Sequence, residues 1–256
     1  MKKQIGSVTR VRIAVLLLAV LLASSSALGV PTDTVTLMED GFGAYGSMAV
    51  YGGGLTGQIG RGGVYLLDII ADGDGAPQWM WDPMPAFCIE LTEESPKFST
   101  DYEIVMPAEA QKPTDFLGSA IGQEKADYLC ELWAAHFDES WFDGSYSLQD
   151  RNEAEAFAAA LWEIIYEDLP DTPQGWDVTT DGTAGPLGFR ACFLDWELAN
   201  DWLGELDGQG PKADLRALVR DGKQDYLVEV PEPATVALLG IAAAMSLARR
   251  RRVRRA

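Results

Sequence analysis

The segment DRNEAEAFAAALWEIIYE, residues 150–167, carries the clearest secondary-structure signal in the chain. Its apolar side chains recur with the period of an amphipathic helix, at Ala154, Phe157, Leu161, Ile164 and Ile165. The same spacing appears on either side of it, over residues 120–137 and 189–206, and a shorter helix is expected over 212–219. The middle of the chain is therefore predicted to be helical.

Outside this helical middle the pattern changes to short apolar runs. Runs rich in β-branched and aromatic residues, separated by glycine clusters at 52–54 and 62–63, lie at residues 34–37, 47–51 and 63–70. Such runs are typical of strands joined by turns. We predict an α+β fold for residues 31–230, with a β-rich N-terminal half, a helical middle and a final strand at 225–230. A chain of 256 residues, 47% of them hydrophobic, can bury such a core.

The charge of the chain is unevenly distributed. With 20 Lys+Arg against 39 Asp+Glu, the net charge is −19. Residues 1–30 hold four basic residues and no acid, and residues 231–256 hold six arginines and one acid, so residues 31–230 carry −28. We expect no nucleic-acid partner for so acidic a body, because phosphate contacts need clustered Lys and Arg. The single His also excludes any site that needs two imidazoles.

The N-terminus has the pattern of a secretory signal peptide. Four basic residues precede an apolar run at 13–23, and small residues follow at 24–27. The apolar run is too short for an ordinary membrane-spanning helix. We expect export through the Sec machinery and removal of residues 1–27 by signal peptidase, with cleavage after Ala27 or Gly29. The body at 31–230 is then an exported domain.

The C-terminus combines three features in order. Pro231, Glu232 and Pro233 precede an apolar segment at 234–248. A basic tail follows, with Arg249, Arg250, Arg251, Arg252, Arg254 and Arg255. As a helix the apolar segment would span about 22 Å, short of a hydrocarbon core of about 30 Å, and arginine snorkelling with local thinning covers part of the gap. By the positive-inside rule the tail stays cytoplasmic and the acidic body lies outside.

This end of the chain, residues 231–256, resembles the PEP-CTERM sorting signal. The resemblance implies processing by an exosortase, a membrane cysteine protease that cuts near the motif and would recognise Pro231, Glu232 and Pro233. It also implies a transient inner-membrane anchor, followed by a place at the cell surface or in the extracellular matrix of an exopolysaccharide-producing, biofilm-forming Gram-negative cell. The prolines keep the segment extended, which presents Glu232 to the protease. An ordinary tail-anchored protein is the alternative.

Two segments of the body resemble the Cys–Gln thioester domains of bacterial surface adhesins. Residues 86–91 match an aromatic-Cys-aliphatic-acidic strand, and residues 156–166 match an aromatic-Gln-x-Ala-aliphatic-Trp-Glu helix. In that family the cysteine thiol condenses with the glutamine amide to form an electrophile that captures amines. Cys88 takes the cysteine position, but Ala158 takes the glutamine position and has no carbonyl to supply. Gln149, about 13 Å away along the helix axis, is a poor substitute.

We therefore expect the scaffold without the thioester, in a protein with a non-catalytic structural or adhesive role. Three cysteines enter an oxidising compartment with the body, so one thiol is left over after any single bridge. A Cys130–Cys192 bridge with Cys88 free is one pairing, and Cys88–Cys130 and Cys88–Cys192 are the others. Buried, reduced thiols are the remaining interpretation.

Two arrangements would make the body an enzyme, and both are disfavoured. A cysteine-dependent hydrolase would combine Cys88 with His136 and Asp138. However, Cys88 lies in an apolar run, and a His at a helix C-terminus more often complements the helix dipole. Facing carboxylates such as Glu163 and Glu167 would suit glycoside hydrolysis, but in so acidic a body we expect them on a solvated face. A covalent adhesin or a hydrolase using Cys88 is the alternative function.

Tryptophans offer a second alternative, an exopolysaccharide-binding module. Trp79, Trp81 and Trp141 lie in expected loops, where exposed rings can stack on sugars. In contrast, core positions are expected for Trp133, Trp162 and Trp196. We expect no cofactor and no metal site, because the acidic turn at 72–75 lacks the later ligands of a calcium loop. Association with an anionic matrix should then depend on Ca²⁺ or Mg²⁺ as bridging ions.

Overall fold

The described part of the chain contains seven strands, three α-helices and two short 3-10 helices. The computed structural model describes residues 34–52, 54–70, 80, 83–110, 119–180 and 188–230. The predicted signal peptide and the predicted sorting signal lie outside these residues. The strands are β1 (Thr34–Gly52), β2 (Leu55–Ile69), β3 (Met84–Cys88), β4 (Thr100–Val105), β5 (Arg190–Cys192), β6 (Leu215–Val219) and β7 (Tyr226–Glu229). The helices are α3 (Gln123–His136), η2 (Glu139–Phe142), α4 (Leu148–Tyr166), η3 (Pro173–Gly175) and α5 (Trp196–Glu205).

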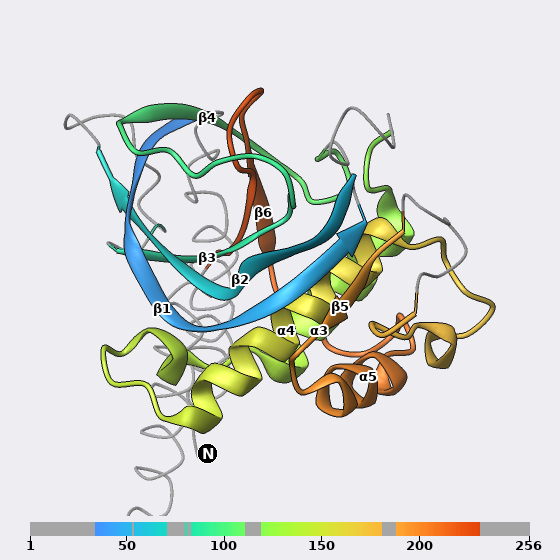
Figure 1. Cartoon of the computed structure of the whole chain (residues 1–256). Helices are drawn as coiled ribbons and strands as arrows, with labels where there is room; N and C mark the ends of the chain where they lie inside the picture. Colours follow the sequence, from blue (N-terminus) through green and yellow to red (C-terminus); the bar gives the residue numbers. More distant parts are fainter. Residues whose placement is uncertain are drawn as a thin grey trace, which may run out of the picture. The chain divides into compact units, whose positions relative to one another are not determined.

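The strands pair into an antiparallel sheet that closes on itself (Figure 1). Their order is β2-β3-β7-β6-β4-β1-β5, and β1 also pairs with β2. β1 can close the ring because its first residues, from Thr34 to Leu37, pair with β4, while the rest of the strand pairs with β2. Six strands therefore form a closed barrel, and β5 pairs with the far end of β1. The β-rich character expected from the sequence is confirmed, and the closure is a new feature.

β1 and β2 form one long hairpin where the sequence pattern predicted three short strands. The glycines at 62–63, expected in a turn, lie inside β2 instead. Gly63 has φ 146°, and a Cβ there would overlap the Ala44 carbonyl. A side chain at Gly46 would overlap the Glu155 carboxylate of α4. These glycines thus permit close backbone approach, and the register shifts along the hairpin are the bulges that bend it into a barrel.

Side chains alternate between the inside and the outside of the barrel. Residues paired across neighbouring strands share a face, so Cys88 lies on the same face as Tyr226, and Phe87 lies with Leu227 on the other. The inner face carries buried side chains that fill the barrel, among them Leu37, Met84, Tyr102, Leu218 and Tyr226. The outer face is covered by helices at Phe87, whose ring centroid lies 4.7 Å from that of Phe157 and 5.6 Å from that of Trp133.

Helix α4 confirms the helix predicted from residues 150–167 and lies at the centre of the packing. Every residue from Ala154 to Tyr166 is buried. The helix contacts β1 and β2 on one side and α3 and α5 on others. A capping box begins it: the Ser147 hydroxyl accepts from the Asp150 amide at 3.1 Å, and the Asp150 carboxylate accepts from the Ser147 amide at 2.6 Å.

The C-terminal end of α4 is closed by a buried lysine from α3. The Lys125 ammonium, whose residue is only 4% exposed, donates to the Ile165 carbonyl at 2.9 Å and also to the Glu167 carbonyl. The last carbonyls of a helix have no partner within the helix, and a cation there also complements the helix dipole. Lys125 thus ties α3 to the end of α4.

Two predicted helices differ from the structure. The pattern at 189–206 begins as β5, and only its second part forms α5, after Phe193 adopts a left-handed φ of 69°. The short helix predicted over 212–219 is wrong, because these residues contain β6, which pairs with both β4 and β7. The predicted final strand is confirmed as β7. Among the described residues, no helix combines the length and the apolar character needed to cross a membrane.

Replacing Lys125 by Met should destabilise the protein by about 2 kcal/mol or more, because two buried carbonyls lose their donor. Chemical denaturation of the Lys125→Met variant measures this loss. The matched control is Lys97→Met, since Lys97 is exposed and, among the described residues, forms an ion pair with Glu94, which is also exposed. Equal losses in the two variants would contradict the role given to Lys125.

Candidate functional site

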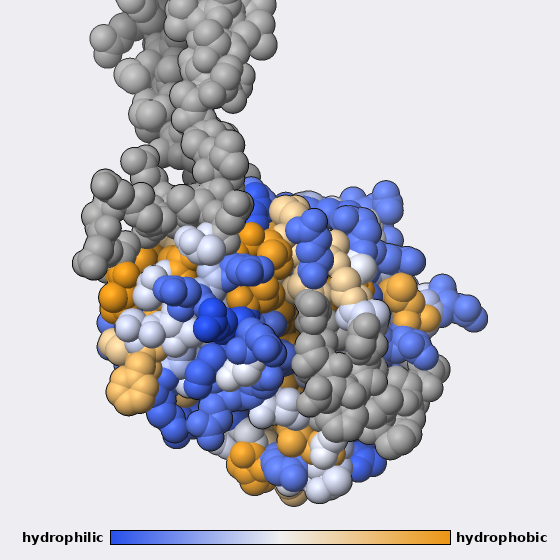
Figure 2. Space-filling model, turned by 90° about the horizontal axis from the view of Figure 1, so that it is seen from above, coloured by the Kyte–Doolittle hydropathy of each residue, from blue (hydrophilic) through white to orange (hydrophobic). Residues whose placement is uncertain are grey.

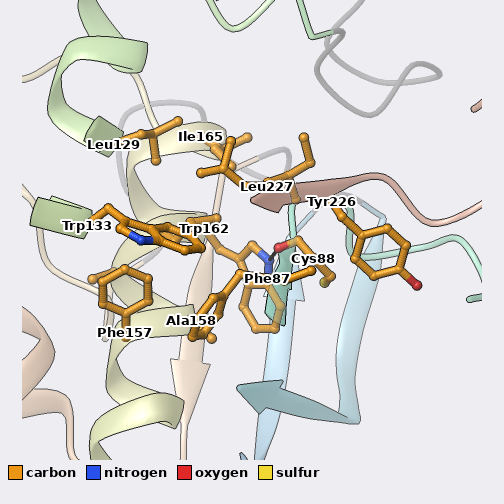
Figure 3. Close-up of a cluster of buried hydrophobic side chains, with 14 of the residues drawn as sticks. Phe87, Cys88, Leu129, Trp133, Phe157, Ala158, Trp162, Ile165, Tyr226 and Leu227 are labelled. Atoms are coloured by element: carbon orange, nitrogen blue, oxygen red, sulfur yellow. Dashed lines mark hydrogen bonds between the residues drawn. The ribbon is translucent and has the colours of Figure 1, made fainter. Parts of the chain in front are cut away.

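The two segments that carry the thioester resemblance meet in the structure (Figure 3). The Trp162 indole of α4 donates to the Cys88 carbonyl at the end of β3, at 2.8 Å. One turn further along the helix, the Tyr166 hydroxyl accepts from the Leu91 amide at 3.0 Å. Two long-range hydrogen bonds and the Phe87–Phe157 ring contact therefore hold β3 against α4.

Cys88 and Ala158 cannot form a thioester in this arrangement. Ala158 is buried, and its methyl group lies toward Gly62 of β2. Cys88 lies between Trp162 and Tyr226 (Figure 3), and its thiol donates to the Glu90 carbonyl at 3.1 Å. Without a side-chain amide at position 158, the thiol has no acyl group with which to condense. Gln149 donates to Glu153 on the exposed face of α4.

The chemistry of the Cys88 thiol is that of a buried, protonated group. Burial raises the pKa of the Cys88 thiol to about 12. Nucleophilic cysteines react as thiolates, which this environment disfavours at neutral pH.

His136 and Asp138, the other members of the hydrolase considered from the sequence, have different partners. The His136 ring stacks on Trp202 with centroids 4.7 Å apart, and its Nε2 lies 3.5 Å from a carboxylate oxygen of Glu205. Burial lowers the pKa of His136. The Asp138 carboxylate accepts from the Ser140 amide and caps η2.

The carboxylates of Glu163 and Glu167 are buried, which corrects the solvated face expected from composition. Glu163 is 2% exposed and accepts from the Asp177 amide at 2.9 Å, while Glu167 accepts from the Phe189 amide at 2.7 Å. Burial raises the pKa of Glu163 to about 8. Both acids fix segments that follow α4, so their role is structural.

The remaining cysteines and tryptophans agree with expectation only in part. Cys88, Cys130 and Cys192 are all free in the structure, with Cys130 on α3 and Cys192 on β5, not on a helix. Trp141, expected in an exposed loop, is 1% exposed and belongs to the core. Trp196, expected in the core, is 46% exposed. Trp133 and Trp162 are buried as predicted, and Trp79, Trp81 and the acidic turn at 72–75 lie outside the described residues.

A pocket of about 720 Å³ is the feature that sequence reasoning missed. Six acids line it: Glu90, Glu93, Glu103, Glu109, Asp221 and Asp225. Glu90 lies two residues after the end of β3, and Asp225 directly precedes β7, so an acid close to the end of each of two apolar strands was the available signal. That these two acids lie in one pocket could not be predicted, because it depends on the order of the strands in the sheet. Among the described residues, no group of three or more His, Cys, Asp or Glu side chains is arranged to hold a metal ion.

The buried Glu163 should make stability fall as pH rises. Because its pKa is raised in the folded protein, the folded state binds more protons than the unfolded state between about pH 4.5 and 8, so unfolding becomes easier with increasing pH. The Glu163→Gln variant lacks this contribution, at most about 1.4 kcal/mol per pH unit. When both proteins are denatured at pH values from 5 to 8, the stability of Glu163→Gln relative to the unmodified protein should increase with pH. The neighbours Glu167, Asp177 and Lys125 are the same in both proteins. The control Glu153→Gln, on the same helix, should show no such trend; parallel profiles for all three proteins would refute the assignment.

Alkylation tests the inertness of Cys88. In the native full-length chain at pH 8, iodoacetamide should leave Cys88 unmodified while the half-buried Cys192 reacts, and all three cysteines should react after denaturation. Peptide mapping by mass spectrometry measures each site. Labelling of Cys88 as fast as Cys192 would contradict a buried, protonated thiol.

Comparison with known proteins bears on the end of the chain. No curated protein and no solved structure matches the chain. Residues 229–252 match the family of the PEP-CTERM protein-sorting motif, which confirms the sorting signal predicted from Pro231, Glu232 and Pro233. The match begins at Glu229, the last residue of β7, and its residues from 231 on lie outside the described part of the chain. The chain therefore carries a PEP-CTERM sorting motif, which implies export, membrane anchoring before processing, and processing by an exosortase.

Proposed function

We propose that this protein is an exosortase-processed component of the cell surface or extracellular matrix with a non-catalytic structural or adhesive role. The observation that carries the proposal is the sorting motif at residues 229–252. Residues 1–27 would be a signal peptide and residues 234–248 a short membrane helix, held by the arginines that follow. Both basic ends would leave during maturation, so the delivered body would carry about the −28 of residues 31–230.

Two features of the body favour a non-catalytic role. The Cys88 thiol is buried on the inner face of the barrel, and Ala158 of α4 offers no amide for a thioester. The acids and the histidine that could have assisted a nucleophile are used elsewhere, in helix capping, ring stacking and loop fixation. A closed barrel packed against a largely buried helix suits a passive component of a surface layer.

The sorting assignment predicts a specific processing defect. Glu232→Gln removes the charge between the two prolines, so cells that contain the exosortase should accumulate the membrane-bound precursor with its arginine tail. Immunoblotting of membrane and released fractions, with intact-mass measurement of the released form, reads the outcome. Glu197→Gln, an exposed acid on α5, is the control and should be processed normally. Normal release of the Glu232→Gln protein would refute recognition through Glu232.

A further inference from the structure

The acidic pocket lies where three parts of the barrel end together. Glu90 follows β3, Glu103 lies on β4, and Asp221 and Asp225 lie between β6 and β7. Figure 2 looks down on the side where β4 and the turn after β6 lie uppermost in Figure 1, and this face is largely hydrophilic. One base, Arg220, accompanies the six acids that line the pocket. The pocket is therefore strongly negative.

Glu90 provides an observation beyond the number of acids. Its residue is only 4% exposed, and its Oε2 atom is buried without a hydrogen-bond partner among the described residues. Glu155 and Glu163 each have such an oxygen too, but of these three acids only Glu90 lines the pocket. A buried carboxylate oxygen without a partner costs free energy, so native proteins rarely retain one without a reason. An occupant that donates to this oxygen would remove the cost.

The backbone around Glu90 holds the carboxylate in place. The Glu90 carbonyl accepts from the Gln224 side chain at 2.7 Å and from the Cys88 thiol at 3.1 Å. The Ile89 amide donates to the Asp225 carbonyl at 3.0 Å, which fixes the next strand beside it. The groups that would meet a ligand are thus positioned before it arrives, which reduces the entropy cost of binding.

Asp225 adds a second buried carboxylate to the same pocket. It is 6% exposed, and its Oδ1 accepts from the Arg220 amide at 2.7 Å. Within the described residues, neither Glu90 nor Asp225 forms an ion pair with a lysine or arginine side chain. Burial, assisted by neighbouring acids, raises the pKa of Glu90 to about 8 and that of Asp225 to about 7. Arg220 is the one basic residue among the described residues that line the pocket, and its side chain forms no ion pair with either acid.

We propose that this pocket binds a linear aliphatic polyamine, with one ammonium group donating to the unpartnered Glu90 oxygen and to Asp225. An ammonium offers three donors and no acceptor, which fits a site lined by acceptors. Glu93, Glu103 and Glu109 at the rim receive the further ammonium groups, and Val105 and Val219 contact the methylene chain. The volume of about 720 Å³ suits a small organic ligand. A metal ion is disfavoured because Ca²⁺ takes six to eight oxygen ligands, and the described residues hold no cluster of three ligating side chains.

Calorimetric titration of the full-length chain in detergent with spermidine tests the proposal. We expect saturable binding of one spermidine, weakened about tenfold or more by Glu90→Gln, which keeps the shape of the side chain and removes its charge. Glu153→Gln, which removes one charge from the exposed face of α4, should bind as the unmodified protein does. Thermal unfolding shows whether Glu90→Gln is folded; Asp225→Asn provides a second variant with the same expected loss.

Several results would overturn the proposal. Equal affinity in all the variants, or binding that does not saturate, would mean diffuse attraction to an acidic surface. If calcium chloride at equal ionic strength binds in place of spermidine, and Glu90→Gln weakens calcium binding to the same extent, the pocket is a metal site. A lysine tripeptide that binds more tightly than spermidine would assign it to a protein partner. None of these results bears on exosortase processing, which Glu232→Gln tests separately.

Discussion

Helix α4 is buried from Ala154 to its end at Tyr166, and a lysine from α3 satisfies carbonyls at that buried end. The last carbonyls of a helix have no partner within the helix, and inside a protein they must be satisfied without water. Lys125 does so, while the capping box of Ser147 and Asp150 begins the helix at its exposed end. The helix then serves as the support against which the barrel hairpin, α3 and α5 all pack. Side chains of the helix and its C-terminal cap also form hydrogen bonds with other segments. Trp162 donates to the end of β3, and Glu163 and Glu167 accept from the loops that follow the helix.

The buried carboxylates of the body differ in their surroundings. Glu163 and Glu167 are buried but accept amide hydrogens, so they organise loops and have structural partners. Glu90 is similarly buried, and one oxygen of Glu90, like one oxygen of Glu163, has no hydrogen-bond partner among the described residues, but Glu90 also lines a pocket. The pocket, and not the missing donor alone, distinguishes Glu90 as an acid that we propose to hold a ligand. It also shows why the large negative charge of the body is an incomplete guide, since the consequence of each acid depends on what surrounds it.

The sequence predicts the helices and the sorting signal better than it predicts the barrel. Helix α4 could be predicted because its apolar residues recur at helical spacing and a capping box begins the helix. The sequence pattern divides the long hairpin into short strands because glycines such as Gly62 and Gly63, which are typical of turns, here lie inside β2 and allow close contact. The pattern predicts a helix for the run that contains Leu215, since short apolar runs are ambiguous and only pairing with β4 and β7 decides them. Glu90 and Asp225 meet through the sheet order, which no local pattern contains.

We propose that the chain is a precursor whose two basic ends are removed and whose body is delivered without covalent chemistry at Cys88. Intact-mass measurement of the protein recovered from the surface or medium of the producing cell tests this most directly. We expect a mass that lacks the signal peptide and the arginine tail, and that equals the remaining sequence without loss of ammonia. A full-length mass, or a mature mass lower by one ammonia that methylamine reverses, would contradict it.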